Sequence, residues 1–276
     1  RYEKVNGVVD YAEVTVGSKY AYYVGWFMSV IYIPCLTSVL AWVSARYTAV
    51  LLGWDITGGS TMTLACFFLV GSYAMNALSP ILAGKFQVST TVIKLVPLML
   101  MAVIGSFKGI TSGMTMANFS HVVDPTVSSS SGLFASVVAV AFAYEGWIIA
   151  TSINAELENS KKNLPKALVL GSLIVVFVYI FYYIGLAGAV STDALMESGQ
   201  TGAMLAFQKI FGSVGGSLIF VFIIISCLGT LNGLMMGCTR GLYSLAVRNQ
   251  GPLPEIFKQV DKITNMPTNS AVFAVL

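Results

Sequence analysis

Residues 167–192 read ALVLGSLIVVFVYIFYYIGLAGAVST, a run of 26 residues without a single Asp, Glu, Lys or Arg. A helix of about 20 apolar residues is long enough to cross the hydrocarbon core of a bilayer. A strand of a membrane β-barrel would alternate between polar and apolar residues, and this run does not alternate. The stretch therefore predicts a transmembrane α-helix.

Similar apolar runs lie on both sides of this stretch, and together they predict an all-α integral membrane protein. We expect one transmembrane domain over residues 1–276, with partial helices at its two ends. The predicted spans cover residues 20–45, 58–84, 87–107, 131–155, 167–192 and 210–239, and the partial helices cover 5–16 and 268–276.

The composition excludes several classes of protein. Hydrophobic residues make up 56% of the chain and charged residues only 10%, whereas a soluble domain carries about 25% charged residues. Soluble enzymes, nucleic-acid-binding proteins and disordered chains are thereby excluded. The chain has one histidine and no HExxH, GxSxG, Walker or dinucleotide motif, so we expect no enzyme activity, no metal site and no cofactor.

The distribution of Lys and Arg predicts the orientation in the membrane. When successive loops are placed on alternate sides, one side receives eleven of the 15 basic residues and the other receives three, with Lys94 left inside a span. Cytoplasmic loops carry the excess of positive charge. The basic loop at 161–166, KKNLPK, is therefore expected in the cytoplasm, with Arg240 and Arg248 on the same side.

Lys94 is the first of two charged residues inside predicted spans. It lies nine residues after Lys85, a helix rise of about 13 Å. One interpretation is that its long side chain extends to the inner interface. The other is a functional role, because a charge inside the bilayer is costly and usually has a partner or a task. A lysine that lines a cavity is a candidate proton acceptor.

Glu145 is the second charged residue, in the middle of the fourth span and directly before Gly146. The helix could be continuous, with Glu145 paired to another buried polar group. Alternatively, Gly146 could permit a break whose free backbone groups bind an ion or a charged substrate.

The segment from Ser226 to Cys238 is a third feature that departs from the apolar pattern. It is rich in small and polar residues, which suit either helix packing or the lining of a polar pathway.

Three motifs resemble the amino acid permeases of the amino acid, polyamine and organocation superfamily. FAYEGWIIATSINAELENSKKNLPKAL (142–168) is similar to the sixth helix of these permeases and the loop after it. SCLGTLNGLMMGCTRGLYSLAVRNQGPLP (226–254) is similar to the eighth helix, and TVIKL (91–95) to the fifth. The family usually has Asn-Pro where this chain has Asn159-Ser160. Within the family, the chain most resembles bacterial relatives of the L-type transporters.

The resemblance implies the fold. Such permeases form a five-plus-five inverted repeat of the leucine-transporter type, usually with twelve helices. The six spans would then be helices three to eight, so the chain would be a fragment of a longer carrier. The broken first helix, with its glycine-rich turn, would lie before residue 1.

The resemblance also implies site residues. The broken sixth helix maps onto Phe142, Ala143, Tyr144, Glu145 and Gly146. Backbone carbonyls of these residues would hold the amino group of the substrate. The aromatic ring of Phe142 would act as an outer gate. Glu145 departs from the small or apolar residue common there. Trp147 and Thr230 complete the expected substrate site. Lys94, with Ser226 beside it, would replace a sodium ion and couple transport to protons.

We therefore predict a multi-pass protein of a bacterial cell membrane that carries amino acids by alternating access, without sodium, by proton symport or amino acid exchange. Its partners would be an amino acid, protons in the case of symport, and membrane lipid, but no nucleic acid; the oligomeric state is left open. The alternative is a non-transporting membrane sensor or assembly subunit derived from a permease.

Overall fold

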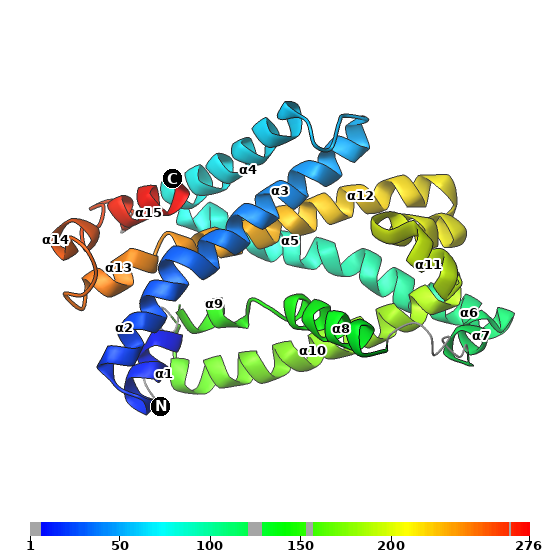
Figure 1. Ribbon diagram of the computed structural model, residues 1–276, viewed down its shortest axis with the longest axis horizontal. Coiled ribbons are helices and arrows are strands. Elements are labelled where there is room, and N and C mark those ends of the chain that lie inside the picture. The colour runs from blue at the N-terminus through cyan, green and yellow to red at the C-terminus, as the bar shows by residue number, and fades with distance from the viewer. Residues whose placement is uncertain (1–6, 121–128, 153–156, 265) are drawn as a thin grey trace. The chain divides into compact units, whose positions relative to one another are not determined.

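The computed structural model describes residues 7–120, 129–152, 157–264 and 266–276 (Figure 1). Every regular element in these ranges is helical, as predicted. A helix satisfies its backbone N–H and C=O groups internally, which an apolar run in lipid requires. Parts of three predictions lie outside the described residues, namely residues 5–6, residues 153–155 and Glu156 of the permease-like motif.

The elements up to Ala143 are α1 (Val8–Thr15), α2 (Ser18–Trp26), π-helical η1 (Phe27–Tyr32), α3 (Ile33–Leu52), α4 (Gly59–Leu78), α5 (Pro80–Leu100), π-helical η2 (Met101–Gly105), α6 (Ser106–Ser112), α7 (Met114–Ser120) and α8 (Ser129–Ala143). The elements after it are α9 (Trp147–Ser152), α10 (Ser160–Ala189), α11 (Thr192–Ser198), 3₁₀-helical η4 (Gly199–Thr201), α12 (Gly202–Cys238), α13 (Gly241–Ala246), α14 (Pro254–Phe257) and α15 (Thr268–Val275).

Six helical stretches of the described chain are long and apolar enough to cross a membrane. They are Ser18–Leu52, Gly59–Leu78, Ile81–Ser112, Gly132–Thr151, Ser160–Ala189 and Gly202–Ala246. Their number and order agree with the six predicted spans. Large apolar side chains on α10, such as Leu170, Phe177 and Phe181, are more than half exposed. A surface of this kind is suited to contact with lipid rather than water.

The structure places the boundary between the second and third spans at Ser79, earlier than the charge-based boundary near Lys85. The helix α4 ends at Leu78 and α5 begins at Pro80. Proline favours the first position of a helix because it has no N–H to leave unpaired. The Ser79 hydroxyl accepts a hydrogen bond from the Leu82 N–H at 3.3 Å, as a capping residue does.

The chain divides into two compact units. Unit 1 contains Arg1–Lys94, Ile148–Lys166 and Val221–Leu276, and unit 2 contains Leu95–Trp147 and Ala167–Phe220. The helices α5 and α12 therefore contribute one part to each unit. The helix α12 also contains a non-helical residue, Gly212, with φ 77° and ψ −174°.

In unit 1, α3 and α4 form an antiparallel pair joined by the short segment between Leu52 and Gly59 (Figure 1). On α3, the alanines Ala41, Ala45 and Ala49 recur every fourth residue, which places them on one helix face. Each is at most 3% exposed. Small side chains on one face let a second helix approach closely in a membrane.

In unit 2, glycines form the contact between α10 and the η2–α6 segment. A Cβ atom added at Gly185 would overlap the Met101 carbonyl, and one added at Gly188 would overlap the Gly105 carbonyl. A Cβ at Gly109 would in turn overlap the Gly188 Cα. The two helices therefore touch through their backbones, as small-residue contacts in membranes allow.

Candidate functional site

The fourth span is interrupted where the sequence placed its mid-membrane glutamate. The helix α8 ends at Ala143 and α9 begins at Trp147, and the residues between them, Tyr144 to Gly146, form a turn. Gly146 has φ 110°, a conformation that is strained for residues with a Cβ atom. Of the two interpretations of this span, the structure shows the discontinuous helix.

A tyrosine of α10 holds the end of α8. The Tyr179 hydroxyl donates a hydrogen bond to the Ala143 carbonyl at 3.0 Å, and the Tyr144 and Tyr179 rings meet edge to face with centroids 5.2 Å apart. The last carbonyls of a helix have no partner within the helix. Tyr179 supplies one, and all three residues belong to unit 2.

The side chains around the break differ in exposure. Phe142 is 56% exposed and Trp147 is 54% exposed, whereas Tyr144 and Glu145 are half-buried. The Glu145 backbone N–H donates to the Phe142 carbonyl at 3.2 Å. Within the described ranges, the Glu145 carboxylate has neither a hydrogen bond nor an ion pair. The break is therefore held by backbone groups and Tyr179, without the carboxylate.

Lys94 lies on α5 in unit 1, half-buried against α12. The two helices run antiparallel, so that Gln87 meets Asn232 and Thr90 meets Gly229. The same register brings Lys94 into electrostatic range of Cys227, the residue after Ser226. The Thr230 hydroxyl donates to the Ser226 carbonyl at 3.0 Å and lies about one turn farther along α12.

Three helices of unit 1 share a buried amide network. The Asn76 side chain of α4 donates to the Asn232 side chain of α12 at 2.9 Å. Asn232 in turn donates to the Ala83 carbonyl at 3.1 Å and to the Gln87 side chain at 3.2 Å, both on α5. Asn232 is completely buried. In lipid, such hydrogen bonds between side chains hold helices together.

A cavity of about 510 Å³ opens in unit 1. Its lining comes from eight segments and is listed by them: α1 (Val8, Val9), η1 (Met28, Ser29), α3 (Ile33), α4 (Asn76), α9 (Ile148, Ile149, Thr151), the end of α12 with the two residues after it (Met236, Gly237, Thr239, Arg240), α13 (Gly241, Tyr243, Ser244) and the segment before α15 (Thr264, Met266, Pro267). None of the nine predicted site residues lines it.

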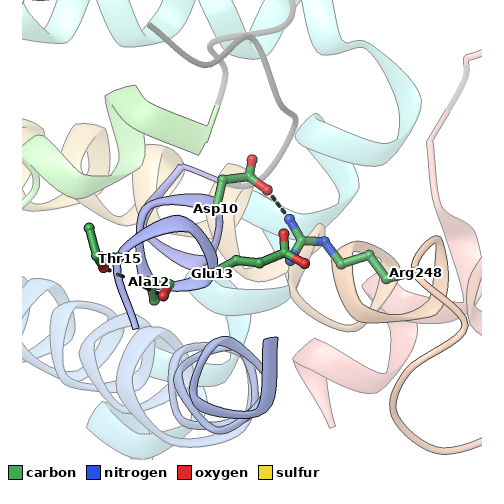
Figure 2. A network of polar contacts seen from close by, with 5 residues as sticks. All are labelled: Asp10, Ala12, Glu13, Thr15 and Arg248. Carbon is green, nitrogen blue, oxygen red and sulfur yellow. Dashed lines mark hydrogen bonds and ion pairs between the residues drawn. The ribbon is translucent and has the colours of Figure 1, made fainter. Parts of the chain in front are cut away.

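An ion-pair network ties α1, which contributes to the lining of this cavity, to the segment after α13. Figure 2 shows Arg248 extended toward Asp10 and Glu13. Arg248 forms an ion pair with Asp10 and a second one with Glu13 at 3.5 Å. The side chains are 19% exposed for Arg248, 2% for Asp10 and 32% for Glu13. Asp10 is thus a buried charge that depends on its partner.

A family model for amino acid permeases matches residues 2–276 of the chain. The chain belongs to the amino acid permease family. This permease chain is therefore a multi-pass protein of the cell membrane and a member of a family of transporters rather than enzymes, as predicted.

The permease chain is also similar to individual relatives. It is 30% identical over 272 residues to the serine/threonine exchanger SteT of Bacillus subtilis. The matched region is 99% of this chain and 60% of SteT. It is 22% identical to the human cystine/glutamate transporter over 272 residues, 98% of this chain and 53% of that protein. It is 26% identical over 211 residues to the lysine-specific permease LysP of Lactococcus lactis, and the matched region is 70% of this chain and 41% of LysP. The chain spans at most 60% of the length of these relatives.

In the permease chain, the predicted site residues fall into two groups. Phe142 to Trp147 are contiguous in unit 2, and Lys94, Ser226 and Thr230 lie on two neighbouring helices of unit 1. Sequence reasoning did not find Tyr179, Asn76, Gln87 or the cavity. A tyrosine in the middle of an apolar span was a usable signal for Tyr179, because a buried hydroxyl needs a partner.

Proposed function

We propose that this chain is the central part of a carrier that moves amino acids across the cell membrane by alternating access. The break between α8 and α9 carries this proposal, because a helix that stops inside a span exposes backbone groups for a charged substrate. Membership of the amino acid permease family and the similarity to SteT support it. The proposal includes the five-plus-five repeat, with the six spans as helices three to eight of a longer protein.

The proposed substrate contact lies at the end of α8. The C-terminal carbonyls of a helix carry partial negative charge, so the carbonyls of Phe142 and Ala143 suit the ammonium group of an amino acid. Tyr144, Glu145 and Gly146 form the turn that ends the helix. Exposed aromatic rings at Phe142 and Trp147 would border the substrate.

The proposed coupling site is Lys94 with Ser226. An ammonium group between α5 and α12 would occupy the place that a sodium ion takes in related carriers, so transport would not require sodium. Proton transfer at Lys94 would support symport, whereas exchange of one amino acid for another needs no ion. The proximity of Lys94 to Cys227, next to Ser226, supports this assignment.

Uptake by the full-length carrier, reconstituted in proteoliposomes, tests the proposal. A panel of amino acids is supplied with and without a pH gradient and with and without sodium. We expect sodium-independent uptake, loss of uptake in Lys94→Ala, and unchanged uptake in the control Lys85→Ala, which alters an exposed lysine of the same helix.

Two results would contradict parts of this proposal. Normal, pH-dependent uptake by Lys94→Ala would remove Lys94 from the coupling site, and a Glu145→Gln variant with unchanged substrate range and pH optimum would assign Glu145 to the scaffold. Failure of the wild type to bind or move any amino acid would favour the non-transporting sensor or assembly subunit.

A further inference from the structure

The ion pairs of Arg248 join two segments of unit 1 that lie far apart in the sequence. Arg248 follows α13, and its partners Asp10 and Glu13 both belong to α1 (Figure 2). The two acidic residues are three positions apart, which places them on the same face of the helix. The Asp10 carboxylate is almost completely buried, whereas Glu13 is more exposed. The contact between α1 and this segment therefore has a buried ion pair at its centre.

Arg248 is fixed to α13, and α13 is fixed to its neighbours. The Arg248 N–H donates to the Leu245 carbonyl at 3.1 Å, which ties Arg248 to the end of α13. Leu245 is packed so closely on α2 that a Cβ atom at Gly25 would overlap its side chain. The Tyr243 N–H donates to the Ser270 hydroxyl of α15 at 3.1 Å. The guanidinium group thus belongs to a firmly held part of unit 1.

The helix α1, in contrast, has a flexible joint to α2. It ends at Thr15, and α2 begins at Ser18. Between them, Gly17 has φ 121°, and a Cβ atom placed there would meet nothing within 4 Å. Glycine adopts backbone angles that other residues resist, and hinges form at such positions between elements. The angle of α1 to α2 can therefore change at Gly17.

The ion pair lies beside the cavity of unit 1. The helix α1 contributes Val8 and Val9 to the lining, directly before Asp10, and α13 contributes Tyr243 among others. Val9 is 5% exposed. If α1 moved away from α13, the part of the wall that Val9 forms would open. Arg248 is on the side that the Lys and Arg distribution assigns to the cytoplasm, so this opening would face the cytoplasm.

A buried ion pair suits a contact that opens and closes. Apolar residues of the same volume would often hold α1 at least as firmly, because two charges lose their hydration when they are buried. When the pair separates, however, both charges regain that hydration, whereas a separated apolar contact exposes its surface to water. The pair therefore favours one arrangement of α1 and still separates reversibly.

We propose that the ion pair between Arg248 and Asp10 is a lock on the cytoplasmic side of unit 1, which holds α1 against α13 and separates in each transport cycle. While the lock is closed, Val9 stays buried in the wall of the cavity. When it separates, α1 turns at Gly17 and the wall opens to the cytoplasm. The inference rests on the proposed function only in that the lock opens during transport.

The first measurement follows the opening of the lock without transport. Val9→Cys in the full-length carrier is labelled from the cytoplasmic face with a membrane-impermeant maleimide, and mass spectrometry quantifies the modification. Adding Arg248→Gln should accelerate labelling at least about tenfold, because it takes the guanidinium away from the buried Asp10 carboxylate. Arg248→Lys keeps the positive charge and should restore most of the protection. Lys258→Gln, which breaks the more exposed pair with Glu255, should have no effect.

Thr61 shows whether the opening is confined to the lock. It is 1% exposed, near the start of α4, on the side that the charge distribution assigns to the cell exterior. Labelling of Thr61→Cys from the outer face should be the same with and without Arg248→Gln. Equal acceleration at residues 61 and 9 would mean that unit 1 had loosened as a whole. That result, or unchanged labelling of residue 9, would overturn the lock.

The second measurement asks whether the lock must open for transport. Asp10→Cys and Arg248→Cys are joined by a bis-methanethiosulfonate reagent in a carrier whose native cysteines are replaced with alanine. Uptake of L-serine, chosen from the similarity to SteT, should be lost on cross-linking and return after reduction with dithiothreitol. Glu255→Cys with Lys258→Cys is the control, because these residues lie within one helical turn and their cross-link joins no separate elements.

The two measurements separate the lock from the proposed function. Faster labelling of residue 9 in Arg248→Gln, without uptake of any amino acid by the wild type, would leave the lock standing and refute the proposed function. Uptake that continues while residues 10 and 248 are cross-linked would refute the lock and leave the function standing.

Discussion

Within each of the two units, the membrane helices are held together by a different kind of contact. In unit 1, amide side chains of α4, α5 and α12 form a buried network around Asn232. In unit 2, α10 meets η2 and α6 through glycines, with backbone against backbone. Unit 2 also has an amide contact, but Asn118 donates it to two backbone carbonyls, at Ala187 near the end of α10 and at Val190 directly after it.

The glycine contact of unit 2 and the amide network of unit 1 should differ in how well they tolerate substitutions. A contact between backbones has one geometry, because no side chain can rotate to relieve an overlap. An amide has two donors and an acceptor that can pair in several ways. The network also adjoins the cavity, since Asn76 belongs to both. We therefore expect substitutions in the glycine contact to be the more damaging.

Gly185→Leu tests the glycine contact and should have the largest effect. The new side chain would overlap the Met101 carbonyl, and overpacking against backbone should cost about 3 kcal/mol or more. The thermal stability of the detergent-solubilised carrier measures this. Gly171→Leu, on the same helix but with nothing within 4 Å of its Cβ position, is the matched control. Equal losses of stability would show that α10 is not held by the glycine contact.

Asp10→Ala extends the test to the charged contact of unit 1. It leaves the partly buried Arg248 without its nearest carboxylate and should cost about 2 kcal/mol, less than a fully buried pair because Arg248 retains some exposure. Glu13→Ala, at a more exposed carboxylate 3.5 Å from the same guanidinium, should cost less than about 1 kcal/mol. Chemical denaturation compares the two. The reverse order would mean that Glu13, and not Asp10, anchors α1.

A double-mutant cycle of Asn76→Ala and Asn232→Ala measures the amide network itself. Hydrogen bonds between membrane helices contribute about 1 kcal/mol, so the two substitutions should be coupled by about that amount. Ser72→Ala is the control, because its buried hydroxyl has no partner among the described residues and lies one turn from Asn76. Coupling between Ser72 and Asn232 as large as that of Asn76 would argue against a specific network.

The smallest expected effect concerns Asp261, in the loop before the cavity-lining residues Thr264 and Met266. Hydrogen bonds from the Thr264 backbone and side chain and the Ile263 N–H hold the pKa of Asp261 below its ordinary value. Its contribution to stability is present at neutral pH and disappears as the pH falls through the lowered pKa of the folded state. Asp261→Asn should flatten this part of the stability profile, and an unchanged profile would assign the acid sensitivity to other groups.

The sequence predicted the spans because they depend on local composition, and a charge-free run must be helical in lipid. Gly146 beside Glu145 left a continuous and a broken fourth span open, and the resemblance to the permeases implied the break. The start of α5 was misplaced because charges served as boundaries, while Ser79 and Pro80 carried the stronger local signal.

The cavity and the Asn232 network could not be read from the sequence, because they depend on distant segments. The lining of the cavity extends from Val8 to Pro267, and no periodicity within one helix reports such a combination. The position of Lys94 near Cys227 has the same origin, because it follows from the register of α5 against α12.

The hydrogen bond from Tyr179 to the Ala143 carbonyl has a consequence for the break in the fourth span. A carbonyl oxygen has two lone pairs, and Tyr179 uses one of them at 3.0 Å. The second lone pair can accept another donor while the tyrosine stays in place. An arriving ammonium group could therefore be bound without first breaking a contact inside the protein, so the helix end would be equally well fixed in its empty and loaded forms.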